Sequence, residues 1–318
     1  MTMKPTVVIL LSDKRSGSTI FQSELLGHAA VRGLGYTSHT FLESHHWLKA
    51  AVMLDRPARL FSAGLRYANY GSNANARTYM IDTILGNVPD YVPPADDRTL
   101  VFDGWEALCR HHAQPVFFEK SPQVLAHWAA LSLLLEWRAQ TDFNVKLVGL
   151  VRNPLAVQYS SEKLFGSNPV ARQYGWAETH RNMLALRGLL PDDAFMILRH
   201  EDIIAAPQAS FAKVCDFIGM PYQDGMGDSI TDRTQNAWAE DPDYTVQLDP
   251  AVRQIAHGLG YDADDLKGRP PKPGQAPGYR RSAPSWQGSV DRYKNMLRDR
   301  VVRPARMRRK AAKARTDG

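Results

Sequence analysis

Four short apolar runs along the chain have the length and composition of β-strands. Each run is nearly continuous in hydrophobicity, whereas a half-exposed strand would alternate apolar and polar residues. Continuous apolar runs are typical of strands that are buried on both faces of a parallel sheet. The predicted strands are Val7–Leu11, Val116–Glu119, Lys146–Val151 and Ala194–Leu198.

Longer segments between and after these runs carry apolar residues at helical spacing. The predicted helices are Ser18–His28, Gln123–Arg138, Pro154–Phe165, Trp176–Leu189 and Ala209–Ile218. Residues 47–91 have little strand character, and we interpret them as a helical insertion. This alternation of strands and helices predicts an α/β fold around a central parallel sheet. A Pro- and Gly-rich stretch at 267–278 predicts an extended loop within an irregular C-terminal region.

The charge is distributed unevenly along the 318 residues, whose formal net charge is +6. Residues 298–318 hold nine Lys and Arg against two Asp, so the rest of the chain is close to neutral. This basic tail predicts either contact with an acidic membrane surface or polyanion, or a solvated segment. The tail lacks the apolar face of a membrane helix, which favours the solvated alternative. We expect residues 1–297 to form one domain and expect no nucleic-acid partner.

The two cysteines, Cys109 and Cys215, are too few for a disulfide framework or a metal cluster. Two buried, reduced thiols are the simpler interpretation. The apolar run near the N-terminus is too short for a signal-peptide core, and no run approaches the length of a membrane span. These patterns predict a cytoplasmic protein.

The first strand runs into a short polar loop, "SDKRSGST", which is followed by a helix. Backbone N–H groups and the helix dipole favour an anion at such a position. Arg15 adds a positive charge, and Gly17 allows a ligand close to the backbone. The Walker pattern of kinases is not met, because Ser12 replaces its first glycine and Ser18 replaces its lysine. Taken alone, the loop is a weak signal and favours a plain strand-to-helix turn over a nucleotide site.

A second polar segment, "RNPLAVQYS", follows the strand that ends at Val151. Arg152 directly follows the strand, and Ser160 lies about two turns into the next helix. Ligands of open α/β sheets bind at the carboxyl ends of the strands, so this pair would suit a second phosphate. For this segment alone, a salt-bridged arginine and an exposed helix serine are the favoured explanation.

Taken together, "KRSGST" and "RNPLAVQYS" resemble the 5′-phosphosulfate loop and the 3′-phosphate motif of sulfotransferases that use 3′-phosphoadenosine 5′-phosphosulfate (PAPS). The segment "FFEKSPQVLAHW" is similar to an element of the carbohydrate- and tyrosyl-type branches. "MILRHEDIIAAPQASFAKVCDFIGMPY" resembles a further family segment, with His200 in place of the usual Tyr. The resemblance covers about residues 6–222 in the correct order. It implies a three-layer, P-loop-like fold.

The resemblance also implies an enzyme that transfers a sulfonate from PAPS to a hydroxyl, with no metal ion. It assigns donor binding to Arg15, Ser16, Gly17, Ser18, Thr19, Arg152 and Ser160. Arg15 would also stabilise the leaving oxygen, and Lys120 would face the transferred sulfonate. The released co-product is 3′-phosphoadenosine 5′-phosphate (PAP).

A general base must accept the proton of the acceptor. Glu43 falls where the resemblance places that base, and His39 is the second choice; His45 and His46 are further candidates in the same segment. Glu119 is another acid, which would simply pair with the adjacent Lys120. Each of these residues also has an ordinary structural interpretation.

The acceptor class stays open at this stage. A carbohydrate or glycolipid is the first expectation, and a small metabolite or natural product is the second. The insertion and the C-terminal region would contact the acceptor, and Arg280 and Arg281 would reach the 3′-phosphate. A P-loop kinase is disfavoured by the missing Walker lysine, and a polyanion-binding module would depend on the basic tail.

Overall fold

The computed structural model describes residues 4–39, 41–56, 73–232 and 235–270. Its strands are β1 (Thr6–Ser12), β2 (Val31–Arg32), β3 (Val116–Lys120), β4 (Asn144–Val151) and β5 (Phe195–Arg199). Its helices are α1 (Ser18–Leu26), α2 (His46–Met53), α3 (Asn73–Asn87), α4 (Asp97–His112), the 3₁₀ helix η2 (Pro122–Ala126), α5 (Trp128–Gln140), α6 (Pro154–Phe165), α7 (Pro169–Leu189), α8 (His200–Ala205), α9 (Pro207–Ile218), α10 (Ala237–Glu240) and α11 (Pro250–Gly258).

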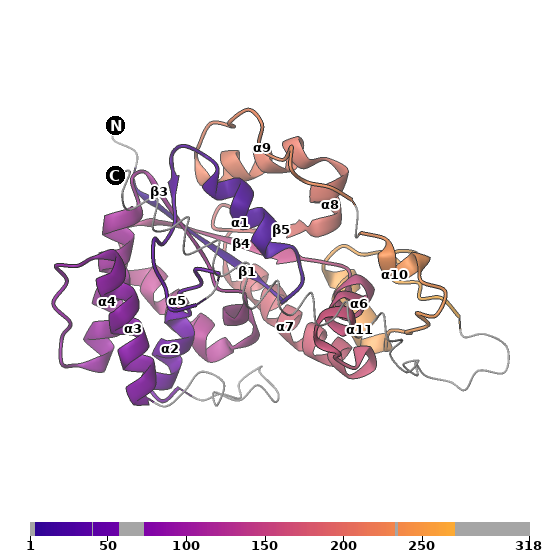
Figure 1. Ribbon diagram of the computed structural model, residues 1–318, viewed down its shortest axis with the longest axis horizontal. Helices are drawn as coiled ribbons and strands as arrows, with labels where there is room; N and C mark the ends of the chain where they lie inside the picture. The colour runs from indigo at the N-terminus through magenta and orange to yellow at the C-terminus, as the bar shows by residue number, and fades with distance from the viewer. Residues whose placement is uncertain (1–3, 40, 57–72, 233–234, 271–318) are drawn as a thin grey trace.

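The five strands form one parallel sheet in the order β2-β3-β1-β4-β5 (Figure 1). The predicted α/β fold with a parallel sheet is therefore confirmed. β1 lies at the centre, and all seven of its residues are buried. Leu10 aligns with Lys120 of β3, and Ser12 aligns with Leu150 of β4. This register brings the carboxyl ends of the three central strands to the same edge of the sheet.

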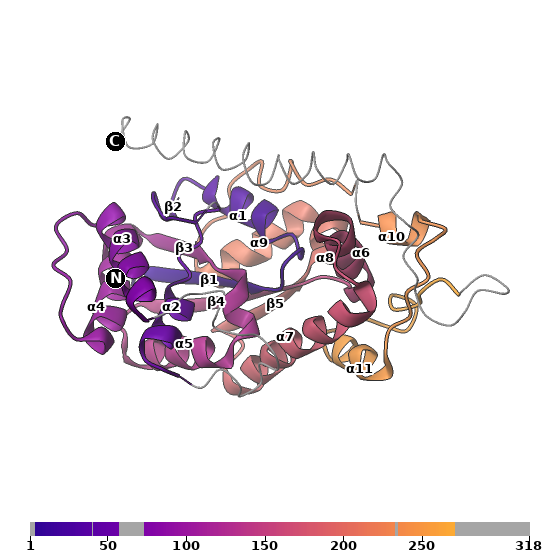
Figure 2. The ribbon, with the colours of Figure 1, turned by 60° about the horizontal axis from the view of Figure 1, so that its bottom comes forward.

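Helices cover both faces of the sheet, which gives three layers (Figures 1 and 2). Alternate residues of β1 enter the two cores: Val7 packs in one core and Val8 in the other. Helices α1, α8 and α9 supply the second core, whereas α2, α3, α4, α5, α7 and α11 contribute to the first, larger one. Burial on both faces explains why the strands are continuously apolar in sequence.

Most of the described part of residues 47–91 is helical, as expected, whereas residues 54–56 and 88–91 form turns and irregular chain. Helices α2 and α3 occupy its two described parts, and their side chains pack in the larger core. Residues 57–72, the part of the Pro- and Gly-rich stretch after residue 270, Arg280, Arg281 and the basic tail lie outside the described residues.

Several predicted boundaries were wrong. The single helix expected at 123–138 is divided into η2 and α5, because His127 adopts an extended conformation between them. Helix α7 begins seven residues earlier than expected, at Pro169. Asn168 caps it by accepting hydrogen bonds from two backbone N–H groups of the first turn, and proline suits the first helical position.

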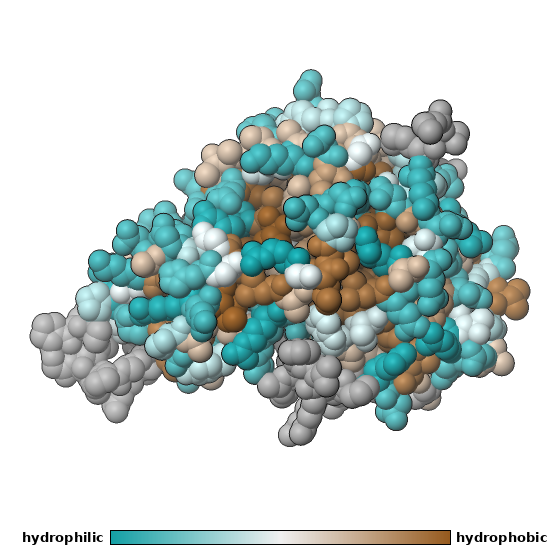
Figure 3. Space-filling model, turned by 180° about the vertical axis from the view of Figure 1, so that it is seen from behind, coloured by the Kyte–Doolittle hydropathy of each residue, from teal (hydrophilic) through white to brown (hydrophobic). Residues whose placement is uncertain are grey.

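On the face seen from behind, hydrophobic side chains gather in the middle and hydrophilic ones cover the margins (Figure 3). Among the described residues, no helix is both long enough and apolar enough to cross a membrane.

Candidate active site

The loop between β1 and α1 has the backbone geometry of a tight anion-binding turn. Arg15 and Gly17 both have positive φ angles, of 73° and 88°. A Cβ atom at Gly17 would lie 2.5 Å from Nδ1 of His200, so glycine is required there by space as well as by conformation. Gly17 is also the N-cap of α1 and offers no side chain to the first-turn N–H groups. These groups are therefore suitably placed for an anion.

The two predicted phosphate motifs meet in the structure. Arg15 Nε donates a hydrogen bond of 3.0 Å to Ser160 Oγ on α6. The guanidinium of Arg152 donates a bond of 3.2 Å to the backbone carbonyl of Arg15. Strand β4 ends immediately before Arg152, and α6 carries Ser160, so the β4–α6 connection supports the β1–α1 loop. The resemblance assigned these residues to two phosphates, and the fold brings them into direct contact.

Arg152 sits on a buried support that the sequence interpretation did not include. Glu201 accepts the backbone N–H of Asn153 at 2.9 Å and the hydroxyl of Tyr261 at 2.7 Å. Trp176 donates its ring N–H to the carbonyl of Arg152 at 3.2 Å. Burial lowers the pKa of Arg152, and the negative charge of Glu201 opposes that shift. The acid of the "RHED" motif was visible in the sequence, but its partners at 153 and 261 were not.

His200 occupies the space beneath the loop, where its ring contacts Gly17. Burial, helped by the charge of Arg152, lowers the pKa of His200 to about 3. The imidazole is therefore neutral at physiological pH and adds no charge beside the β1–α1 loop. At this position the ring of His200 fills the space that a side chain at position 17 would need.

The second half of the site is a buried cluster around Glu43. Lys120 Nζ lies 2.6 Å from Glu43 Oε1, and both side chains are almost fully buried. His45 Nε2 lies 3.0 Å from Glu43 Oε2, and His39 Nδ1 lies 3.5 Å from the same oxygen. The structure thus brings together the two candidate bases, Glu43 and His39, and the candidate lysine, Lys120.

The electrostatics of the cluster keep Glu43 ionised. Burial pushes the pKa of Glu43 upward, but the hydrogen bond to His45 and the charge of Lys120 outweigh it and lower the pKa to about 2. Burial lowers the pKa of His39 to about 4 against the attraction of Glu43. The charges of Lys120 and Lys14 act in the same direction as burial at His39. Lys14 belongs to the β1–α1 loop, so the Glu43 cluster lies within electrostatic reach of that loop.

Glu119 does not pair with Lys120, and the expectation that it would was wrong. Successive strand residues point to opposite faces, and the lysine reaches Glu43 instead. The Glu119 carboxylate is fully buried and accepts the backbone N–H and the hydroxyl of Ser44, together with the hydroxyl of Ser121. Burial raises its pKa. Ser121 Oγ in turn accepts the backbone N–H of His45 at 3.0 Å, so Glu119 fixes the segment that carries Glu43.

His46 points away from the cluster. Its Nε2 lies 2.8 Å from the backbone carbonyl of Val101, and burial lowers its pKa to about 4. It packs against the rings of Trp47 and Trp105 in the larger core. Among the candidate histidines, His46 therefore has a structural role.

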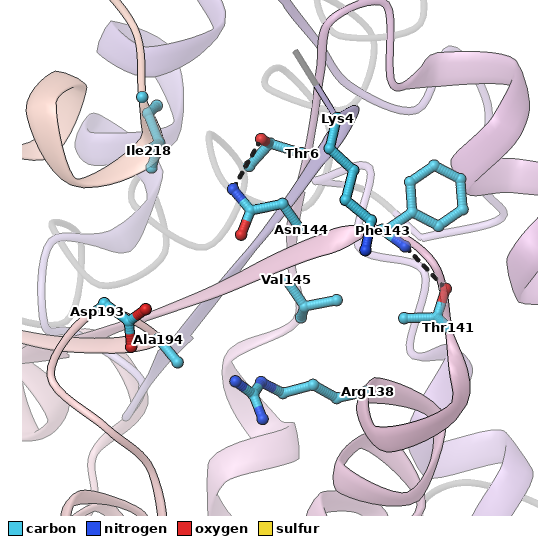
Figure 4. Close-up of a pocket in the computed structure, with 11 residues that line it drawn as sticks. Lys4, Thr6, Arg138, Thr141, Phe143, Asn144, Val145, Asp193, Ala194 and Ile218 are labelled. Carbon is cyan, nitrogen blue, oxygen red and sulfur yellow. Dashed lines mark hydrogen bonds between the residues drawn. The ribbon is translucent and has the colours of Figure 1, made fainter. Parts of the chain in front are cut away.

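A cavity of about 470 Å³ lies at the opposite edge of the sheet and is separate from this site. Figure 4 shows that it is lined by the amino ends of the strands: Thr6 of β1, Asn144 and Val145 of β4, and Ala194 before β5. Ligands of parallel α/β sheets bind at the carboxyl ends, which here carry the phosphate loop and Lys120. The candidate active site therefore lies at the carboxyl edge, away from this cavity.

The part of the chain that carries this site matches a known protein family. A protein-family model described as "Sulfotransferase family" matches residues 5–224, which is more than half of the chain. The chain belongs to the sulfotransferase family. The matched range contains the phosphate loop, the Glu43 cluster, Arg152 and Ser160. The PAPS-dependent sulfotransferase predicted from the motifs is thus confirmed as the class of this enzyme.

Solved structures agree with the family at the level of the fold. The sulfotransferase domain of the Synechococcus PCC 7002 olefin synthase is 21% identical, with a TM-score of 0.55 over 82% of this chain and 98% of that one. The sulfotransferase domain from the curacin biosynthetic pathway is 19% identical, with a TM-score of 0.53 over 81% and 98%. The sulfotransferase STF1 of Mycobacterium tuberculosis H37Rv is 13% identical, with a TM-score of 0.43 over 81% and 77%. No curated protein matches this sulfotransferase.

Proposed function

We propose that this sulfotransferase moves the sulfonate of PAPS to a hydroxyl of a carbohydrate or glycolipid, with Glu43 as the general base. The observation that carries the proposal is the buried Glu43–Lys120 pair, 2.6 Å apart, at the sheet edge that also holds the phosphate loop. An ionised carboxylate can accept the acceptor proton, and an adjacent ammonium can neutralise a sulfonate. An in-line transfer requires both tasks at the reacting sulfur, and the proposal assigns them to these two groups.

The donor would be held by the two motifs that meet at Arg15. The backbone N–H groups of Ser16, Gly17, Ser18 and Thr19 would bind the 5′-phosphate at the N-terminus of α1. Arg152 and Ser160 would bind the 3′-phosphate. Ser160 Oγ accepts a hydrogen bond from Arg15, and its own hydroxyl hydrogen can still donate to a phosphate oxygen.

The reaction is a displacement at sulfur. The acceptor oxygen forms a bond to sulfur while the bond between sulfur and the 5′-phosphate oxygen breaks, and PAP leaves with that bonding pair. Arg15 would stabilise the charge that develops on the leaving oxygen. The acceptor proton would pass to Glu43, and Lys120 would contact the sulfonate during transfer. His39 and His45 would then act on the base through their contacts with its Oε2.

A small natural product is the second candidate acceptor. The two structures with TM-scores above 0.5 are sulfotransferase domains of an olefin synthase and of the curacin biosynthetic pathway. Their names place both domains in biosynthetic systems, and this observation is the reason for testing a natural product as the second acceptor class.

The test is transfer of labelled sulfonate from PAPS to a panel of glycans, glycolipids and small hydroxylated natural products. Turnover confined to the saccharides supports the first acceptor class, and turnover confined to small alcohols supports the second. Calorimetry should show PAP binding without magnesium and much weaker binding of ATP. Arg152→Ala should weaken PAP more than it weakens a nucleotide that lacks the 3′-phosphate. Equal affinity for ATP and PAP would contradict the donor assignment.

A further inference from the structure

Three metal-ligating side chains converge on one oxygen of the candidate base. Ligand atoms of His39, Glu43 and His45 all lie within 4.8 Å of one another. Glu43 Oε2 is 3.0 Å from His45 Nε2 and 3.5 Å from His39 Nδ1. The His39 and His45 rings face each other, with centroids 4.5 Å apart. The sulfonate transfer needs one proton acceptor here, whereas the cluster holds one carboxylate and two imidazoles.

The spacing and the donor types both fit a zinc ion. Zinc bonds of about 2.0–2.2 Å in a tetrahedral site place neighbouring ligand atoms roughly 3.3–3.6 Å apart. The distance from Glu43 Oε2 to His39 Nδ1, 3.5 Å, lies within this range, and the distance to His45 Nε2, 3.0 Å, lies slightly below it, so small side-chain rotations would close the site. Two imidazoles and one carboxylate, with the fourth position open, are the protein ligands of one common type of zinc site.

We propose that His39, Glu43 and His45 form a Zn²⁺ site and that zinc bound there reversibly inhibits sulfonate transfer. The metal would occupy Oε2 while Lys120 occupies Oε1, so no oxygen of Glu43 would be left to accept a proton. The binding half of the proposal rests on the geometry alone. The inhibitory half rests also on the proposed function of Glu43 as the base.

The surrounding structure holds the ligands in place for such an ion. The backbone N–H of His45 is fixed by Ser121 at 3.0 Å, and the backbone carbonyl of Glu43 accepts the hydroxyl of Tyr79 at 3.2 Å. These contacts fix the chain at two of the three ligands, so less ordering is left for the metal to impose. His39 also accepts the N–H of Phe41 at 3.4 Å, a long contact that a metal bond would replace.

Access and charge set the strength of the site. The side chain of His39 is 30% exposed, whereas that of Glu43 is 7% exposed, so the ion would enter from the side of His39. Lys120 contacts the other carboxylate oxygen and repels a cation, which weakens binding. A site that is geometrically suitable but electrostatically opposed would bind zinc reversibly and release it to a chelator.

The first experiment measures binding without turnover. Chelator-treated full-length protein is titrated calorimetrically with Zn²⁺, and with Co²⁺ to record the visible spectrum of a four-coordinate site. We expect one saturable site in the wild-type protein. His39→Asn should weaken Zn²⁺ by more than about a hundredfold, since even outer partners of metal ligands are worth about 10- to 100-fold.

His45→Asn should weaken Zn²⁺ to a similar extent, and thermal melting establishes that each variant is folded. Because the His39 side chain is partly exposed, the His39→Asn protein still tests the site if substitution of the buried His45 prevents folding. His111→Asn is the matched control, because His111 is exposed and belongs to another part of the chain. Unchanged Zn²⁺ affinity in the folded His39→Asn protein would overturn the proposed site.

The second experiment measures transfer with the active acceptor from the panel. Micromolar Zn²⁺ should inhibit the wild-type enzyme, chelator should restore it, and residual activity of His39→Asn should be less sensitive than that of His111→Asn. Zinc that binds with the predicted stoichiometry and leaves transfer unchanged would overturn the inhibitory proposal. Zinc binding by a protein that transfers sulfonate to no acceptor supports the metal site and contradicts the proposed function instead.

Discussion

Arg15 Nε donates a hydrogen bond of 3.0 Å to Ser160 Oγ, although 145 positions separate the two residues in the sequence. The motif resemblance assigns Arg15 to the 5′-phosphate and Ser160 to the 3′-phosphate. If the assignment holds, the two phosphate sites share this hydrogen bond, and a change in one motif should alter binding at the other.

The Ser160→Ala variant tests this coupling. Removal of the hydroxyl should weaken PAP by about tenfold, which corresponds to the net value of a single hydrogen bond to a charged group. A nucleotide that carries only the 5′-phosphate should also bind less well, because Arg15 loses this hydrogen bond. Calorimetry with both nucleotides measures the effect. Ser132→Ala on α5, where the hydroxyl bonds only its own helix, is the control. Full affinity for the 5′-only nucleotide in Ser160→Ala would show that the contact is dispensable.

The Arg15→Ala variant separates ground-state binding from catalysis. If Arg15 stabilises the leaving oxygen, kcat should fall by on the order of a hundredfold, and donor affinity should fall as well. Steady-state kinetics with varied PAPS gives both quantities. An unchanged kcat with a raised KM for the donor would limit Arg15 to holding the phosphate in the ground state.

The Glu43→Gln variant tests the base. The amide keeps the shape of the side chain and removes its ability to accept a proton, so transfer should fall by roughly a hundredfold or more. PAP binding, measured by calorimetry, should be retained. His39→Ala and His45→Ala are assayed beside it. Near-normal turnover of Glu43→Gln together with an inactive histidine variant would transfer the role of base to that histidine.

Buried histidines should make the fold sensitive to acid. Burial lowers the pKa of His180 to about 4, whereas an unfolded histidine titrates at about 6.5. Below pH 6.5 the unfolded chain therefore binds more protons than the folded one. The stability contributed by neutral His180 is complete above pH 6.5 and is lost progressively as the pH falls toward 4.

Chemical denaturation between pH 7 and pH 4 measures this dependence. The free energy of unfolding should decrease across the interval, and His180→Gln should decrease less steeply than the wild type. Equal slopes for His180→Gln and wild type would show that other groups dominate the acid response.

Local patterns were sufficient for the parts of the fold that depend on neighbouring residues. The apolar runs gave the four longer strands, because burial on both faces requires continuous hydrophobicity. β2 was not predicted, because a strand of two residues is too short to show a periodic pattern. It is a strand only through its pairing with β3. α4 was not anticipated, although Asp96 caps it by accepting the N–H of Thr99.

The sequence by itself predicted the β1–α1 loop as a candidate anion site, since a glycine and a basic residue between a strand and a helix suit an anion through local geometry. It also selected Glu43, His39, Lys120, Arg152 and Ser160 as candidates. Only the tertiary structure decided their partners. Lys120 faces Glu43 across 77 positions, Glu119 faces Ser44, and Arg15 meets Ser160. The sheet order and the parallel register create these contacts, and neither is written in the spacing of residues along the chain.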